Sequence, residues 1–145
     1  MDEDAFKSAR ADINRLPCVF ENALLSGCAV CELSASHAVA ERQIIACTSP
    51  VARVDCGQLA ALLREKSAFA LRLTSTRRIL PHAMMMKIQC GGLQGMRQAL
   101  DPVAGQPDVR RMVLKGRERY GELAMLPFSE IVQGVAAFKL RRRHK

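Results

Sequence analysis

Residues 26 to 59 read SGCAVCELSASHAVAERQIIACTSPVARVDCGQL, and this stretch holds four of the six cysteines of the chain. Cys18 lies just before it, and Cys90 follows in KIQCGGLQG, so that the spacing is C-x9-C-x2-C-x15-C-x8-C-x33-C. The residues after Cys90 contain no cysteine. In a reducing compartment, thiols gathered in this way are more typical of metal ligands or redox groups than of structural disulfides.

The composition favours a helical domain with an aliphatic core. The chain has 145 residues, of which 49% are hydrophobic, and this is enough for one domain that buries a core. Only 4% of the residues are aromatic and there is no tryptophan. Alanine and leucine are abundant and favour helices over sheets. We therefore expect a single all-α domain over residues 1–145, with five to six helices built around a cysteine-ligated metal centre.

Apolar residues recur at helical spacing along most of the chain. Asp55, Asp108 and Ser129 are expected to cap helices, and Pro81 fits the start of another. The glycines after Cys90 are expected to interrupt or end that helix. The expected parts of the domain are a cysteine-rich part over 18–90, a helical C-terminal part over 108–140 and a basic tail over 139–145. The expected helices cover about 4–16, 32–47, 56–71, 82–90, 109–123 and 130–143, with another turn or two of helix over 19–27 and a continuation of the fourth helix over 93–100.

Four cysteines are the candidate metal ligands. Cys28 and Cys31 form a CxxC pair, whose thiolates share one side of a helix or tight turn. Cys47 adjoins the break at TSP, and Cys56 lies at an expected helix start, where the helix dipole favours thiolate. Two further cysteines, Cys18 and Cys90, are reserve ligands.

The spacing leaves three interpretations of these thiols open. The first is an iron–sulfur cluster bound by four cysteines, with [4Fe–4S] favoured over [2Fe–2S]. The second is a structural zinc site, although a single CxxC pair does not match the two knuckles that are usual for zinc. The third is a set of buried core thiols or redox thiols, because free cysteine packs well as a small apolar residue.

The leading functional hypothesis is an iron–sulfur protein that serves as an electron-transfer or accessory subunit of a larger enzyme. The chain contains no P-loop, dinucleotide fingerprint, GxSxG or HExxH motif, so the sequence does not predict an enzyme of its own. Two alternatives come from other classes. One is a zinc-stabilised module that binds nucleic acid or protein, and the other is a metal-free helical adaptor.

The net charge of +8 predicts attraction to an anionic partner. An acidic protein surface on a larger redox enzyme fits better than nucleic acid, because almost no aromatic side chains accompany the basic ones. No apolar run is long enough to span a bilayer and no signal peptide is visible, so we expect a cytoplasmic protein. The candidate partner-binding residues are Lys139, Arg141, Arg142, Arg143 and Lys145.

Overall fold

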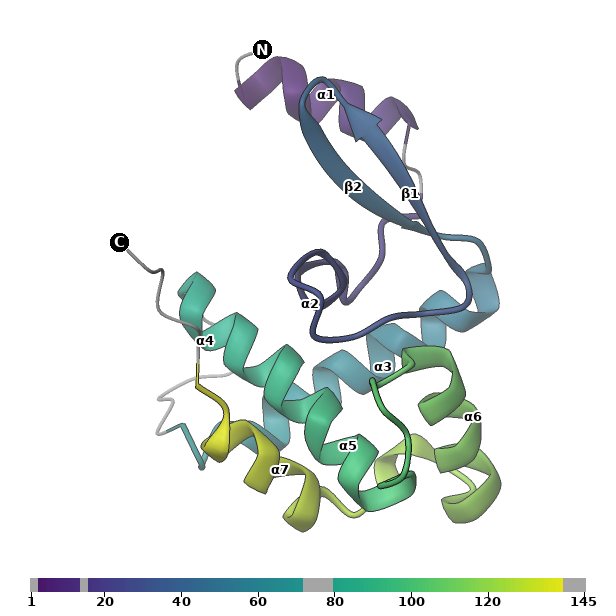
Figure 1. Ribbon diagram of the computed structural model, residues 1–145, viewed down its shortest axis with the longest axis vertical. Helices are drawn as coiled ribbons and strands as arrows, with labels where there is room; N and C mark the ends of the chain where they lie inside the picture. Colours follow the sequence, from purple (N-terminus) through teal and green to yellow (C-terminus); the bar gives the residue numbers. More distant parts are fainter. Residues whose placement is uncertain (1–2, 14–15, 72–79, 140–145) are drawn as a thin grey trace.

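The computed structural model describes residues 3–13, 16–71 and 80–139, and every structural statement below refers to these residues. Helices form one end of the molecule, and a β-hairpin with the N-terminal helix forms the other end (Figure 1). In chain order the elements are α1 (Glu3–Ile13), α2 (Glu21–Leu25), β1 (Ser34–Val39), β2 (Arg42–Cys47), α3 (Pro50–Ser67), α4 (His82–Met86), the π-helical turn η1 (Lys87–Gly91), α5 (Gly92–Leu100), α6 (Val109–Tyr120), the 3-10 turn η2 (Leu123–Met125) and α7 (Phe128–Ala137).

The expectation of an all-α fold built around a cysteine-ligated metal centre is wrong. Strands β1 and β2 pair as an antiparallel hairpin where the sequence predicted a helix over 32–47. Within the described part of the chain, moreover, no group of three or more His, Cys, Asp or Glu side chains is placed to hold a metal ion. The fold is therefore mainly helical with a small two-stranded sheet.

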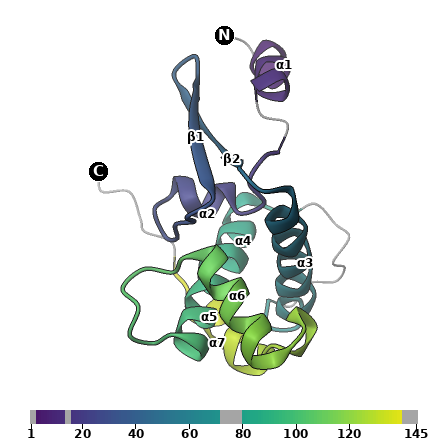
Figure 2. The ribbon, with the colours of Figure 1, turned by 90° about the vertical axis from the view of Figure 1, so that its right-hand side faces the viewer.

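The hairpin is supported by backbone hydrogen bonds that β2 makes outside the pair. The second edge of β2 bonds to the chain just before α2: the backbone N–H of Cys47 donates to the carbonyl of Leu16 at 2.7 Å, and that of Cys18 donates to the carbonyl of Ile45 at 3.0 Å. Figure 2 shows the hairpin standing away from the helical body. These long-range hydrogen bonds outweigh the local preference for helix.

Helix α1 covers one end of the hairpin. Phe6 of α1 packs with Val39 and Ile44 in a small buried cluster. The guanidinium of Arg42 lies 4.2 Å from the centre of the Phe6 ring and pairs with the Glu3 carboxylate at 2.5 Å. This cluster is separate from the main core of the helical body.

One continuous helix crosses the helical body from His82 to Leu100, because η1 joins α4 to α5 without a break (Figure 1). The helix passes through Gly91 and Gly92, where the sequence predicted an interruption. Helix α7 packs closely against this part of it. A Cβ added at Gly91 would lie 2.7 Å from the carbonyl oxygen of Gly134, and a Cβ at Gly95 would overlap the carbonyl of Ile131. The glycines thus permit the helix crossing.

The core of the helical body is aliphatic, as the composition predicted, and it joins α3, α5, α6 and α7. Helix α6 begins as expected, because the Asp108 side chain accepts from the backbone N–H of Arg111 at 3.1 Å. The largest fully buried aliphatic side chains in this cluster are Leu59, Leu63, Leu93, Met96, Val109, Val113, Leu123, Ile131 and Val135.

A buried carboxylate ties α3 to α6. Helix α3 starts at Pro50, with Ser49 as its N-cap, so that Asp55 lies inside the helix rather than at its start. The Asp55 carboxylate accepts from Arg110 at 3.0 Å and from Arg117 at 2.7 Å, and its side chain is only 11% exposed. The two arginines supply the positive charge that burial of this carboxylate requires.

We expect the Asp55→Asn substitution to lower the free energy of unfolding by about 3 kcal/mol, because it removes the anion and leaves Arg110 partly buried without its partner. Equilibrium denaturation in urea measures this change. The matched control is Glu32→Gln, since the Glu32 carboxylate lies 3.9 Å from Arg111 in an exposed pair. That control should cost less than about 0.5 kcal/mol. Equal effects of the two substitutions would contradict a stabilising role for the Asp55 contacts.

Candidate functional site: a pocket of four thiols

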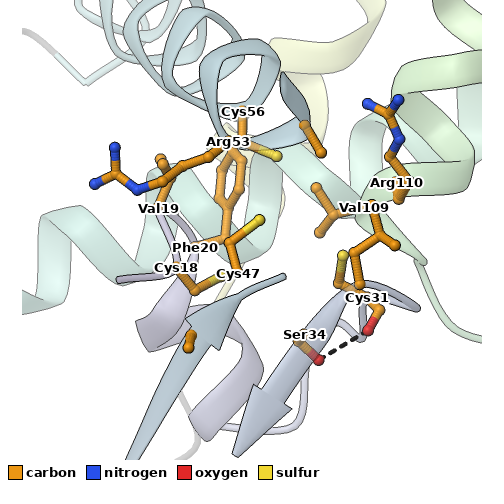
Figure 3. Close-up of a pocket in the computed structure, with 13 residues that line it drawn as sticks. Cys18, Val19, Phe20, Cys31, Ser34, Cys47, Arg53, Cys56, Val109 and Arg110 are labelled. Atoms are coloured by element: carbon orange, nitrogen blue, oxygen red, sulfur yellow. Dashed lines mark hydrogen bonds between the residues drawn. The ribbon is translucent and has the colours of Figure 1, made fainter. Parts of the chain in front are cut away.

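Four of the six cysteines line one pocket between the hairpin and the helical body (Figure 3). Each comes from a different segment of the chain. Cys18 precedes α2, Cys31 follows it, Cys47 ends β2 and Cys56 lies in the second turn of α3. Side chains separated by up to 38 positions in the sequence therefore converge on one place.

Backbone contacts position two of these thiols. The hydrogen bonds between β2 and residues 16–18 bring Cys18 and Cys47 side by side at the base of the hairpin. The Cys47 thiol also donates to the carbonyl oxygen of Ser49 at 3.2 Å, just before α3 begins. The local fold thus places the ends of β2 and of the 16–18 segment at the same wall of the pocket.

Cys31 lies on a loop that runs beside the start of α6. The backbone N–H of Val30 donates to the carbonyl of Pro107 at 2.9 Å, and the N–H of Val109 donates back to the carbonyl of Val30 at the same distance. The Ser34 hydroxyl donates to the carbonyl of Cys31 at 2.8 Å (Figure 3). This bridge aims the Cys31 side chain toward the pocket.

The remaining lining is largely apolar, and its polar residues are Ser34, Arg53 and Arg110. Val19, Phe20, Ala52 and Val109 are among the apolar residues of the wall. Arg53 and Arg110 bring positive charge to it, and the Arg53 guanidinium is fixed by donating to the carbonyl of Pro17 at 2.8 Å. Sequence reasoning did not identify either arginine. The only signal for these arginines in the sequence is that each lies within three residues of a cysteine or of a predicted helix cap.

Burial disfavours the thiolate form of Cys18, Cys31 and Cys56. It raises the pKa of Cys18 to about 11 and that of Cys56 to about 12, and it also raises the pKa of Cys31. Charge repulsion from neighbouring thiolates further raises the pKa of Cys18 and of Cys56. Backbone hydrogen bonds act in the opposite direction, from Phe20 to Cys18 and from Leu33 and Arg110 to Cys31.

The donor set of this pocket is suited to a thiolate-bound metal. Four cysteine sulfurs are the ligands of iron–sulfur clusters and of structural zinc, and backbone hydrogen bonds to the sulfurs are typical of such sites. The enclosed cavity has a volume of only about 20 Å³, close to that of one water molecule. Because the described thiols do not form a ready coordination group, they would have to move together around a metal.

The structure places Cys28 and Cys90 elsewhere, in a disulfide with a Cα–Cα distance of 5.9 Å. Of the four principal candidate ligands, Cys31, Cys47 and Cys56 therefore share the pocket, while Cys28 does not. The reserve residue Cys18 completes the set of four. Residues 28–31 are not helical, so that the two cysteines of the CxxC pair point to different places.

Two histidines of the sequence could also serve as metal ligands in principle, but neither lines the pocket. His37 is exposed in β1 and His82 is exposed at the start of α4. Of the basic residues proposed to bind a partner, Lys139 is exposed just after α7. The other four, Arg141, Arg142, Arg143 and Lys145, lie outside the described residues.

The chain matches no known protein family, no curated protein and no solved structure. Its function must therefore be argued from the pocket itself. Among the helices in the described part of the chain, none has the length and apolar character needed to cross a bilayer.

Proposed function

We propose that the protein binds an iron–sulfur cluster through Cys18, Cys31, Cys47 and Cys56, and that it serves as an electron-transfer or accessory subunit of a larger enzyme. The observation that carries this proposal is the convergence of four free thiols from four segments on one largely apolar pocket. When bound, the cluster would supply one-electron transfer. The protein would hold it, shield it from water and present it to a partner.

The second coordination layer supports iron–sulfur binding. Backbone N–H groups that hydrogen-bond cluster sulfurs stabilise the thiolate form and shift the reduction potential. Such contacts reach Cys18 from Phe20, and Cys31 from Leu33 and Arg110. A cluster with four thiolates has a net negative charge, and the Arg53 side chain in the wall of the pocket would offset part of it.

The net charge of +8 supports docking to an acidic surface. We place that surface on a larger redox enzyme, because a small protein with a single cluster needs a partner to use its electron. Since the attraction is electrostatic, added salt would weaken it.

Zinc is the second candidate, and the small volume of the cavity favours it, because one ion needs less space than a cluster. The ligand spacing argues against zinc. With Cys28 outside the pocket, no two of the four thiols form a CxxC pair with each other, whereas structural zinc sites are usually built from such knuckles. Metal binding to either centre would release protons from the buried thiols.

We expect anaerobically purified protein to be brown, to absorb near ~400 nm and to contain iron and acid-labile sulfide. The Cys18→Ser variant should lose most of its iron, because it removes a ligand from the pocket. The matched control is Cys28→Ser, which removes a thiol that lies outside the pocket and should retain its iron. Metal analysis and visible absorption of the two variants measure the difference.

Three outcomes would count against this assignment. A colourless protein with stoichiometric zinc would show that the pocket binds zinc and not an iron–sulfur cluster. A protein without any bound metal would leave buried core thiols as the explanation of the pocket. Loss of iron in Cys28→Ser together with retention in Cys18→Ser would show that a different set of cysteines binds the cluster.

A further inference from the structure

The Cys28–Cys90 disulfide lies in the wall of a second cavity, away from the four free thiols. This cavity has a volume of about 570 Å³, and both cysteines of the disulfide line it together with Ser26, Phe138 and Lys139. A space of this kind can admit a small molecule. The disulfide is therefore not sealed inside the core, as a purely structural bridge would be.

The two sulfurs differ in access. Cys28 is half-buried in the loop after α2, whereas Cys90 is only 1% exposed in the π-helical turn of the long helix. A nucleophile that enters the cavity would therefore meet the Cys28 side first. In thiol–disulfide exchange the sulfur that is attacked and the sulfur that leaves have different roles, and access helps to decide between them.

A hydroxyl group stands beside the sulfur that would leave. The Ser26 Oγ lies 3.7 Å from the Cys90 Sγ, within hydrogen-bonding distance for sulfur. Donation from this hydroxyl would stabilise Cys90 as a departing thiolate, and stabilising the leaving thiolate favours exchange. In the disulfide-bonded form the Ser26 hydroxyl donates to the carbonyl of Ala23 at 3.0 Å, so its one hydrogen would turn from this carbonyl to Cys90 as the thiolate forms.

The rim of the cavity is cationic. Lys139 is exposed at the cavity, and none of the described residues that line it is acidic. A thiol that carries carboxylates would be attracted to this rim and to the positive protein as a whole.

We propose that Cys28–Cys90 is a thiol-exchange site for an anionic low-molecular-weight thiol. The incoming thiolate attacks the Cys28 Sγ, the bond between Cys28 and Cys90 breaks, and a mixed disulfide forms on Cys28. Cys90 leaves as a thiolate and takes up a proton. A second molecule of the thiol then attacks the sulfur of the first, which releases Cys28 as a thiol and oxidises the two small thiols to their disulfide.

The test uses the full chain, purified oxidised, with glutathione as the anionic thiol and 2-mercaptoethanol as the neutral one. A non-reducing tryptic digest should first show residues 16–42 linked to residues 88–97. After brief exposure to glutathione, acid quenching and tandem mass spectrometry, the adduct should be found on Cys28 at about ten times the level on Cys90. A digest without the linked peptides, or an adduct mainly on Cys90, would overturn the proposal.

Two variants test the chemistry of the cavity. Lys139→Glu should slow the reaction with glutathione by about 3- to 10-fold at low salt and leave the reaction with 2-mercaptoethanol within about 2-fold. Ser26→Ala should slow both reactions, because it removes the hydroxyl beside the leaving sulfur. Equal rates of wild type and Lys139→Glu with glutathione would overturn the choice of an anionic thiol. These readouts do not depend on bound metal, so they succeed or fail independently of the cluster assignment.

Discussion

Replacing Gly95 by alanine is expected to lower the free energy of unfolding by about 3 kcal/mol or more and the melting temperature by about 10 °C. The added Cβ would overlap the backbone carbonyl of Ile131 in α7. A backbone carbonyl cannot rotate away as the end of a flexible side chain can, so α5 and α7 would have to separate. Separation would also open the contact between Gly91 and Gly134 in the same crossing.

Two other glycines provide controls for this effect. Gly57 lies in α3, and a Cβ there would meet nothing within 4 Å. Gly57→Ala should therefore raise the stability by about 0.5–1 kcal/mol through helix propensity alone. Gly116→Ala should cost less than Gly95→Ala, because the one tight contact of its Cβ, at 2.8 Å, is with the end of the flexible Leu126 side chain. Thermal melting of the three variants measures the order, and equal stability of Gly95→Ala and wild type would contradict close helix packing.

Removing the Cys28–Cys90 bridge is expected to lower the free energy of unfolding by about 4 kcal/mol. The two cysteines are 62 positions apart, so the disulfide closes a long loop and removes much conformational freedom from the unfolded chain. The double substitution Cys28→Ala/Cys90→Ala makes this change without a reductant. Urea denaturation of the oxidised wild type and of the double variant measures the difference.

The addition of a reductant provides the control for the bridge. Reductant should lower the stability of the wild-type protein to about that of the double variant, and it should leave the double variant unchanged. Mass spectrometry of alkylated thiols must show that reduction has occurred. A wild-type protein that is fully reduced at Cys28 and Cys90 but equally stable would contradict a stabilising disulfide.

Helices in the C-terminal half were the most predictable part of the fold. In that half, the Asp108 cap starts α6, and the apolar residues Ile131 and Val135 of α7 are buried. The expected Ser129 cap was wrong, because α7 begins at Phe128 after Pro127. The start of α3 was less well predicted. Ser49 and Pro50 are a good helix start by their own chemistry, but the TSP segment also reads as a break.

The hairpin could not be predicted because its turn lacks the usual residues. Two-residue hairpin turns favour Asn-Gly or similar pairs, whereas this one uses Ala40 and Glu41, with Ala40 at a positive φ of 56°. Tertiary contacts compensate for the unfavourable positive φ of Ala40. These contacts are the hydrogen bonds of Cys18 and Cys47 and the packing of Ile44 against α1. Each joins residues that are far apart in the sequence, so no local pattern reveals it.

The sequence also could not predict which cysteines lie together in the thiol pocket and which form the disulfide. A CxxC pair shares one side only when the residues between form a helix or tight turn. Here Val30 instead bridges to Asp108 in an extended conformation. Side chains of an extended chain alternate, so residues three apart point to opposite sides. Cys28 therefore faces the long helix and Cys31 faces the thiol pocket, while Cys18 joins the pocket through the contacts of β2.

The π-turn at Lys87–Gly91 changes the phase of the long helix partway along its length. A π-turn contains one residue more than an α-turn, and in a helix each residue advances the side chains by about 100°. The side chains of the long helix therefore point in different directions before and after the turn, without a proline kink. Within the turn, Gln89 accepts from the backbone N–H of Ala23 in α2 at 3.2 Å, and beyond it Gly95 meets α7. The long helix thus contacts α2 through Gln89 and α7 through Gly95. A regular α-helix of the same sequence would not point these two residues toward both neighbours.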